Sequence, residues 1–272
     1  MRAAILKKIP RKTVEIFCHP GHHQWNFFRN KCNVCRRSTI FLCDDATQRW
    51  IRKCIWCRST PKYRAIVSVI EQHLGMPLST YLQDGSRELY ELTSTSPIHK
   101  CHYHRPNYVC SAYFFDKPFK KELAPRIWNE DIRDTHFQSE SFDVIVSSET
   151  MEHVRRPWDG FKEIHRILKP GGIHFFTIPY RTDYVTRARI DTSGAADVDL
   201  MPRVYHQDPY RREDSLVYTD FGSDLAELLT TIGFRTTEHA VWEETTDIRD
   251  DLRPMRVFSS QKLPAKASTD EA

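Results

Sequence analysis

Four cysteines of the 272-residue chain form two Cys-x-x-Cys pairs, Cys32 with Cys35 and Cys54 with Cys57. Each pair can turn two sulfurs toward one ion, and the eighteen residues between the pairs allow a hairpin that brings them together. Because four thiolates leave no open coordination position, we predict one structural zinc ion per chain. Two disulfides are the alternative interpretation, which a reducing compartment would disfavour.

Other residues of this cysteine-rich segment could also bind metal. The sequence CHPGHH could form a second site, or replace one of the four ligands, through Cys18, His19, His22 and His23. Cys43 is more typical of a small core residue. Basic side chains beside the two pairs would offset the thiolate charge and favour deprotonated ligands: Lys31, Arg36, Lys53 and Arg58.

The charge of the chain is divided unevenly. Residues 1–65 contain 15 Lys and Arg against 3 Asp and Glu, whereas the whole chain has a formal net charge of only +4. A small, strongly basic module predicts an anionic partner, such as a nucleic acid, a phosphorylated substrate or an acidic surface. A solvated basic face without a partner would give the same composition.

The apolar runs of the sequence are short. None approaches the roughly 20 residues that a membrane-spanning helix requires. The first residues, MRAAILKKIPRK, lack the long apolar region of a secretory signal. These features predict a cytoplasmic protein without a membrane span.

The elements that must position the candidate residues divide the chain into four parts. Residues 1–60 form the basic cysteine-rich module, for which strand-like segments at 39–43 and 49–51 predict a zinc ribbon. Residues 61–86 are expected to hold a connecting helix and then a linker punctuated by Gly and Pro. We predict an α/β domain over 87–262 and a disordered tail over 263–272.

Strand-like and helix-like segments alternate from residue 87 onward. Strands are predicted at 87–92, 108–115, 126–128, 142–148, 173–179, 234–244 and 255–261. A helix beginning at Pro157 is expected to run until Pro170 and Gly171 stop it, and a later helix ends at Gly233. Because strand, helix and strand in this order favour parallel neighbours, we predict an open, doubly wound sheet.

The centre of this domain carries three motifs in sequence. Asp131 follows the third predicted strand, SFDVIVSSETMEHV supplies the fourth strand and its loop, and RILKPGG leads into the fifth. With YHQDPYRREDSLVYTDFGSDLAELLTTIGF downstream, the domain resembles class I S-adenosylmethionine-dependent methyltransferases of type 11 over about 87–261. The resemblance implies a Rossmann-like α/β fold with the seven-stranded methyltransferase sheet, here preceded by a small zinc-ribbon module.

The resemblance also implies S-adenosylmethionine as cofactor, bound beyond the carboxyl ends of the first four strands. It assigns eight residues to this cofactor: Glu91, Thr93, Ser94 and Thr95 to the amino acid part, Asp131 and Ile132 to the adenine, and Ser148 and Glu149 to the opposite side. The aromatic run at 113–115 is expected to supply core and adenine wall.

Two positions depart from the family pattern. Thr93, Ser94 and Thr95 stand where a Gly-x-Gly turn lets the backbone approach the cofactor. Ala112 stands where an acidic residue pairs with the ribose, and Asp116 lies four residues further on. These departures leave open an alternative function, a non-catalytic methyltransferase-like protein whose basic zinc module binds an anionic polymer or a protein.

Two loops hold candidate catalytic residues. His153, in the ETMEHV loop, lies where an imidazole could take a proton from an acceptor, although a locally packed histidine would look the same. Tyr205 and His206 lie where substrate-specific elements of this fold occur, and a loop ordered by Asp208 is the alternative there. No Asn-Pro-Pro-Tyr motif follows the fourth strand, so the predicted methyl acceptor is a small molecule or glycan rather than an adenine amine.

Overall fold

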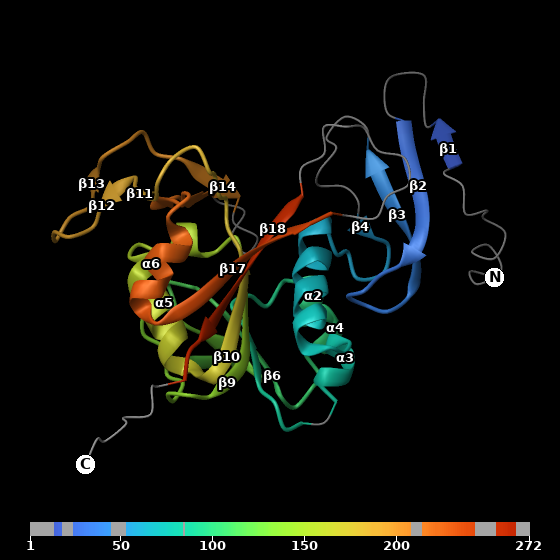
Figure 1. The fold of residues 1–272 in the computed structure, drawn as a ribbon, viewed down its shortest axis with the longest axis horizontal. Coiled ribbons are helices and arrows are strands. Elements are labelled where there is room, and N and C mark those ends of the chain that lie inside the picture. Colours follow the sequence, from blue (N-terminus) through green and yellow to red (C-terminus); the bar gives the residue numbers. More distant parts are fainter. Residues whose placement is uncertain are drawn as a thin grey trace, which may run out of the picture.

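A mixed sheet forms the centre of the computed structural model, which describes residues 14–17, 24–44, 53–83, 85–207, 214–242 and 254–264 (Figure 1). Within those residues, eight strands join in the order β17-β18-β10-β9-β5-β6-β8-β7. Their bounds are β5 (Leu89–Glu91), β6 (Tyr108–Ala112), β7 (Lys121–Ala124), β8 (Ile127–Asn129), β9 (Phe142–Ser148), β10 (Leu168–Thr177), β17 (Phe234–Val241) and β18 (Met255–Lys262). Strands β8, β6, β5, β9 and β10 are parallel, whereas β18 runs antiparallel to both β10 and β17. The predicted doubly wound α/β sheet is confirmed.

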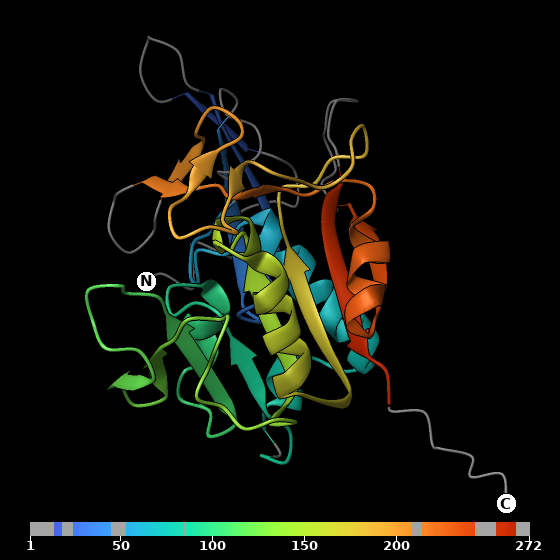
Figure 2. The same cartoon turned by 90° about the vertical axis from the view of Figure 1, so that its left-hand side faces the viewer.

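Helices cover both faces of this sheet (Figures 1 and 2). On one face lie α2 (Pro61–Leu74), α3 (Leu78–Tyr81) and α4 (Pro97–His102), and on the other lie α5 (Pro157–Ile167) and α6 (Leu225–Ile232). Strand side chains alternate between the two resulting cores: Val144 and Val146 pack on the α2 side and Ile145 on the α5 side. All three are buried, as expected of a parallel strand with both faces covered.

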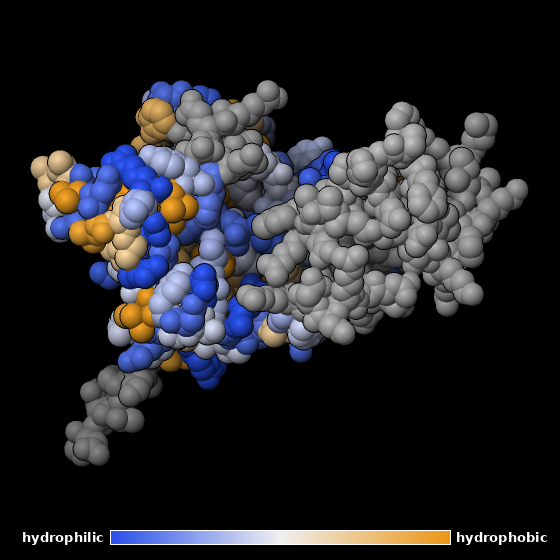
Figure 3. Space-filling model, turned by 90° about the horizontal axis from the view of Figure 1, so that it is seen from above, coloured by the Kyte–Doolittle hydropathy of each residue, from blue (hydrophilic) through white to orange (hydrophobic). Residues whose placement is uncertain are grey.

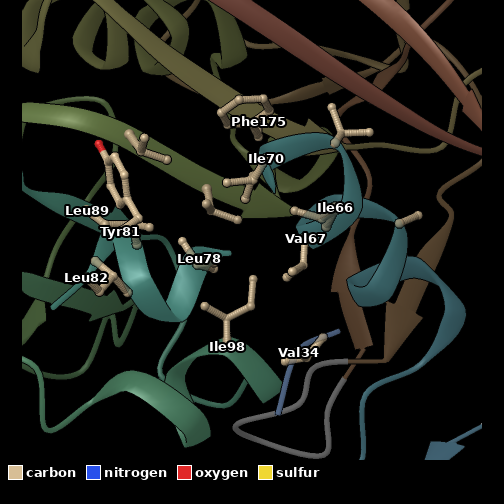
Figure 4. Packing of buried hydrophobic residues seen from close by; sticks show 14 of the residues in the cluster. Val34, Ile66, Val67, Ile70, Leu78, Tyr81, Leu82, Leu89, Ile98 and Phe175 are labelled. Carbon is tan, nitrogen blue, oxygen red and sulfur yellow. The ribbon is translucent and has the colours of Figure 1, made fainter. Parts of the chain in front are cut away.

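The cysteine-rich module shares the core on the α2 side. Within the described residues it is an antiparallel sheet of β1 (Val14–Phe17), β2 (Gln24–Lys31), β3 (Ser38–Asp44) and β4 (Lys53–Cys54). Val34 packs in one cluster with Ile66 and Val67 of α2, Leu78 of α3 and Phe175 of β10 (Figure 4). Strand β3 contains the predicted segment 39–43, whereas 49–51 lies outside the described residues.

The segment between the module and the sheet is packed. Helix α2 contacts β10, β17 and β18, so the predicted connecting helix also covers the sheet. The stretch predicted as a linker contains α3, whose Leu78 and Tyr81 are buried. Of the predicted tail, 265–272 lies outside the described residues.

The boundary between α5 and β10 differs from the prediction. The helix ends at Ile167, and β10 begins at Leu168, which is extended and pairs with Phe142. The register then shifts before Ile173. Backbone carbonyl oxygens of 142, 143 and 169 lie 2.9–3.1 Å from where a Cβ of Gly172 would be, so this glycine allows the strands to approach closely. The Pro-Gly-Gly sequence therefore belongs to an irregular strand rather than to the end of the helix.

An insertion between β10 and α6 lies above the carboxyl ends of the parallel strands (Figure 2). It contains three small sheets, each of two strands, formed by β11 (Arg187–Ala188) with β16 (Thr219–Asp220), β12 (Ile190–Asp191) with β13 (Val198–Asp199), and β14 (Tyr205–Gln207) with β15 (Asp214–Leu216). Seen from above, hydrophobic side chains are interspersed with hydrophilic ones on the coloured surface (Figure 3). Val185, Val198 and Leu200 of the insertion are exposed.

Gly222 allows the end of the insertion to lie close against the beginning of the insertion. A Cβ at this position would lie 2.3 Å from the backbone oxygen of Tyr184 and 2.6 Å from the nitrogen of Thr186. We expect Gly222→Ala to lower the free energy of unfolding by roughly 2 kcal/mol or more, because backbone must move to admit the methyl group. Denaturant unfolding of this variant and of Gly194→Ala, whose Cβ would meet nothing closer than 3.6 Å, checks this, and equal losses would contradict it.

Candidate cofactor crevice and metal clusters

A crevice of about 780 Å³ opens at the carboxyl ends of β5, β6, β8 and β9. Six of the eight residues predicted to hold the cofactor line it: Thr93, Thr95, Asp131, Ile132, Ser148 and Glu149. The two others, Glu91 and Ser94, are not among its lining residues. Loops that follow four different strands thus meet at one place, as expected at the switch point of an open α/β sheet.

The turn after β5 leaves the crevice open although it contains no glycine. The hydroxyl oxygens of Thr93 and Thr95 lie 3.1 Å apart, and the backbone N–H of Thr95 donates to the Thr93 hydroxyl at 3.3 Å. Ser96 then caps the N-terminus of α4, and its hydroxyl accepts from the backbone N–H of His99 at 2.9 Å. Side-chain hydrogen bonds therefore hold this turn, which contains no glycine.

Glu91 lies beneath this turn and is 1% exposed. Burial raises its pKa to about 7, although hydrogen bonds from the Ser96 and Tyr108 hydroxyls act in the opposite direction. Tyr108 donates to one carboxylate oxygen, and the other has no hydrogen-bond partner among the described residues. Glu91 therefore supports the turn from below.

The elevated pKa of Glu91 predicts a loss of stability as the pH rises. Its ordinary pKa is 4.5, so between pH 4.5 and 7 the folded chain binds a proton that the unfolded chain releases, and unfolding becomes easier with increasing pH. We expect Glu91→Gln to remove this part of the pH dependence. Urea unfolding of both proteins at pH 5, 6, 7 and 8 checks this, and parallel pH profiles would contradict it.

At the predicted adenine end, Arg133 donates to Asp131 with a distance of 2.9 Å from Nε to Oδ1. Burial raises the pKa of Asp131, but the hydrogen bonds and charge of Arg133 outweigh burial and bring it below its usual range. Ala112 lines the crevice, whereas Asp116 is exposed and is not among the lining residues. The departure at Ala112 is therefore not compensated by Asp116.

The aromatic run at 113–115 is mostly outside the core. Tyr113 lines the crevice, as an adenine wall would. Strand β6 ends at Ala112, however, and Phe115 is 65% exposed, so the expectation of core packing is wrong for this residue. Periodicity could not locate the end of β6, because the apolar run continues beyond it.

Ser148 and Glu149 form the opposite side of the crevice. The Ser148 hydroxyl lies 3.1 Å from the Thr177 hydroxyl, and the backbone N–H of Glu149 donates to the Thr177 carbonyl at 2.8 Å. Glu149 has a positive φ of 51°, which turns the chain out of the strand. Lys62 of α2 lies 4.0 Å from its carboxylate, and burial lowers the pKa of this lysine against the attraction of Glu149 and Glu152.

The predicted catalytic residues separate into two groups. His153 lines the crevice, and its ring centre lies 5.0 Å from that of His206 on β14. Tyr205 precedes His206 in the same strand, so its side chain points to the opposite face, and it is 46% exposed outside the crevice. The structure therefore brings the two histidines together and leaves Tyr205 apart.

Glu152 lies between the two histidines and was not a predicted catalytic residue. One of its carboxylate oxygens, Oε1, lies 3.5 Å from Nε2 of His153 and 3.9 Å from Nδ1 of His206. Burial raises the pKa of Glu152 well above its usual range, helped by the charge of Glu149 and opposed by that of Lys62. The adjacent Glu and His of ETMEHV are visible in the sequence, but their approach to His206 depends on the fold of the insertion.

The four predicted zinc ligands form a second cluster. The sulfurs of Cys32 and Cys57 lie 3.7 Å apart, as do those of Cys35 and Cys54, and all four lie within 4.8 Å of one another. A tetrahedral zinc site with Zn–S bonds of 2.3 Å requires neighbouring sulfurs about 3.8 Å apart. All four thiols are free, so no disulfide joins them. Their arrangement fits one tetrahedral ion.

The two Cys-x-x-Cys turns have the same backbone geometry. In each, the N–H of the residue after the second cysteine donates to the first cysteine carbonyl, at 2.8 Å for Arg36 and 2.9 Å for Arg58. Both arginines have a positive φ, 60° and 65°. The buried hydroxyls of Ser59 and Thr39 lie 3.3 and 3.4 Å from cysteine sulfurs and can donate to thiolates. The other candidate ligands, Cys18, His19, His22 and His23, lie outside the described residues, as does the side chain of Cys43.

The cysteine-rich module also supplies part of the crevice wall. Lys53, Cys57 and Arg58 line the crevice, together with Lys100 from α4. The sequence indicates a basic module, but not that some of its charge faces the cofactor crevice. The packing of the module on α2 produces this arrangement.

Comparison with known proteins supports the same class of fold. Residues 110–176 match the family described as "Methyltransferase domain". This match contains the end of β6, all of β7, β8, β9 and α5, and nearly all of β10, and it confirms the resemblance that the sequence motifs indicate. No curated protein matches the chain.

Solved structures of methyltransferases are similar to this chain at low sequence identity. A Mesorhizobium loti S-adenosylmethionine-dependent methyltransferase is 16% identical, with 75% of this chain and 98% of that chain covered and a TM-score of 0.45. A Methanosarcina mazei S-adenosylmethionine-dependent methyltransferase is 15% identical, with 70% and 98% covered and a TM-score of 0.39.

No helix of the described residues is long and apolar enough to cross a bilayer.

Proposed function

We propose that the protein is an S-adenosylmethionine-dependent methyltransferase that modifies a small-molecule or glycan acceptor. The observation that carries this proposal is the open crevice at the carboxyl edge of a methyltransferase-like sheet. Side chains at that edge could have filled the space in the absence of the usual glycine turn. Instead, Thr93 and Thr95 line a cavity of about 780 Å³.

The residues of the crevice fit the chemical groups of this cofactor. Thr93 and Thr95 supply hydroxyls for its amino acid part, and Asp131 and Tyr113 supply a carboxylate and a ring for its adenine. When bound, S-adenosylmethionine supplies an electrophilic methyl group on a sulfonium centre. The chain's contribution is to orient the acceptor and exclude water, because methyl transfer depends mainly on placement.

In this proposal the acceptor lies at the basic part of the crevice. Lys53 and Arg58 reach the crevice from the cysteine-rich module and Lys100 from α4. These charges favour an acceptor that carries an acidic group, such as a carboxylate or a phosphate. His153 lies at the crevice wall, where a bound acceptor would be close to it.

The four-cysteine cluster is proposed to hold one structural zinc ion. The sulfur spacing fits tetrahedral zinc, and Cys32, Cys54 and Cys57 are almost completely buried. Because all four ligands are cysteines, the ion would stabilise the module without an open position for a substrate. Metal analysis of the purified chain should find one zinc ion bound with the stability of a structural site.

Isothermal titration calorimetry with S-adenosylmethionine and its demethylated product tests cofactor binding. We expect both to bind with micromolar or tighter affinity, and Asp131→Ala to weaken both. Transfer of labelled methyl groups to pools of acidic metabolites and glycans would then identify the acceptor. Absence of binding at high micromolar concentration would contradict the proposed methyltransferase function.

A non-catalytic role is the second candidate, and one observation favours it. Neither Ala112 nor the exposed Asp116 supplies the carboxylate that related sequences place near the ribose. In that role the basic module would bind a polyanion, with an affinity that falls steeply as salt increases. Heparin or RNA binding by the full chain, unchanged by saturating S-adenosylmethionine, would support this role over the first.

A further inference from the structure

We propose that Glu152, His153 and His206 form a second metal site, which binds one divalent transition-metal ion beside the crevice. The side chains come from η1 (Met151–His153) and from β14 in the insertion. One ligand atom of each lies within 4.8 Å of the others. Two imidazoles and one carboxylate are a ligand set for Zn²⁺, Fe²⁺, Mn²⁺ or Co²⁺, with coordination positions left open for water or an acceptor oxygen.

The distances are close to those that a metal ion requires. Metal bonds of 2.0–2.2 Å in tetrahedral geometry separate neighbouring ligand atoms by about 3.4 Å. Oε1 of Glu152 lies 3.5 Å from Nε2 of His153 and 3.9 Å from Nδ1 of His206. A small rotation of the His206 side chain, which is 41% exposed, would complete the site.

The orientation of His153 is fixed as it is in many metal sites. Its Nδ1 lies 2.9 Å from the carbonyl oxygen of Leu216, which can only accept, so Nδ1 carries the hydrogen. In the neutral ring Nε2 is then the unprotonated nitrogen, and it faces Glu152. In a metal-binding histidine, the ring nitrogen that does not bind the metal usually donates a hydrogen bond, for example to a backbone carbonyl, and this fixes the orientation of the ring.

The buried carboxylate of Glu152 points independently to a bound cation. Glu152 is 1% exposed, and neither of its carboxylate oxygens has a hydrogen-bond partner among the described residues. Burial of such a group is costly unless a charge or donor compensates it. The nearby Lys62 and Glu149 form their own pair at 4.0 Å, so their charges largely offset each other. A divalent ion would neutralise Glu152 directly.

The site would also connect two elements that are distant in the chain. Besides the three ligands, the N–H of Tyr218 donates to the Glu152 carbonyl at 2.8 Å. An ion bound here would hold the β14–β15 hairpin against η1. Because His153, Ser215 and Tyr218 all line the crevice, binding would fix part of its wall.

Cobalt(II) titration of the full chain with its four-cysteine site already loaded with zinc tests the proposal without any methyl acceptor or cofactor. We expect one additional Co²⁺ per chain, with visible d–d bands and no thiolate charge-transfer band. Glu152→Gln and His206→Ala should each weaken binding by roughly tenfold or more, the scale seen when even outer partners of ligands are lost. His104→Ala, which removes an exposed histidine elsewhere, should leave binding unchanged.

Replacement of one ligand type by another makes the assignment specific. His206→Cys should retain Co²⁺ and add a thiolate charge-transfer band that the wild-type second site lacks. No additional Co²⁺ in the wild type, or equal binding by His206→Ala and His104→Ala, would overturn the proposal. Thermal unfolding of each variant distinguishes loss of ligand from loss of fold. Methyl transfer can fail while this site binds metal, so the two proposals are tested separately.

Discussion

Loss of the proposed zinc ion is expected to destabilise the α/β domain as well as the cysteine-rich module. Cys32, Cys54 and Cys57 are 0–3% exposed and lie in the same core as Ile66 and Ile70 of α2. If Cys54→Ser prevents zinc binding, no ion holds the remaining cysteines together. The edge of the core on this face of the sheet then loses its support. We expect the free energy of unfolding to fall by more than about 4 kcal/mol, the range associated with loss of a metal.

The measurement is urea unfolding followed by two signals, zinc release and the circular dichroism of the sheet. In the wild type the two signals should change at the same urea concentration, and in Cys54→Ser the circular dichroism transition should move to lower urea concentration. Cys110→Ala is the matched control, because Cys110 is also fully buried in this core but lies on β6. Cys110→Ala should lower the free energy of unfolding by only about 1 kcal/mol, as expected for a small cavity. An α/β domain that unfolds at wild-type urea concentration in Cys54→Ser would contradict the expected coupling.

The sheet was predictable because its strands carry a strong local signal. The limits of β9 agree with the prediction from Phe142 to Ser148, and β18 differs from it by one residue. Helix α6 ends before Gly233, as predicted, and this glycine has the positive φ, 107°, that is typical of a helix-terminating glycine. The clustering of the two Cys-x-x-Cys sequences was also predictable, because their spacing alone limits how four thiols can come together.

Features that depend on contacts between distant segments could not be predicted from the sequence. The approach of His206 to Glu152 requires the insertion to fold over η1, and no local pattern encodes this. The same holds for Lys53 and Arg58, whose position at the crevice follows from packing of the module on α2. The irregular start of β10 was missed because Pro and Gly are common signals of a helix end, but here Pro-Gly-Gly lies within a strand.

These contacts give the crevice two walls of different origin. Strand ends supply Thr93, Asp131 and Ser148, whereas the cysteine-rich module supplies Lys53 and Arg58. The packing of the module therefore affects the acceptor side of the proposed site as well as the stability of the fold. Zinc loss should consequently reduce acceptor affinity before it reduces cofactor affinity, because the cofactor residues follow strands of the central sheet.

Thr93→Trp is expected to abolish cofactor binding. Thr93 is half-buried in the turn after β5 and lines the crevice, so an indole there would occupy the space proposed for the amino acid part of S-adenosylmethionine. We expect calorimetry to show an affinity at least about 100-fold weaker, which corresponds to roughly 2.8 kcal/mol. Thr93→Ser, which keeps the hydroxyl, should bind as the wild type does.

Thr182→Trp is the matched control, because this exposed threonine lies in a neighbouring cavity of about 560 Å³ rather than in the crevice. It should retain cofactor affinity and wild-type unfolding behaviour. If Thr93→Trp and Thr182→Trp bind the cofactor equally well, the cofactor does not occupy the crevice after β5. If Thr93→Ser also fails to bind while remaining folded, the methyl group of Thr93 matters more than its hydroxyl, and the proposed role of the hydroxylated turn is wrong.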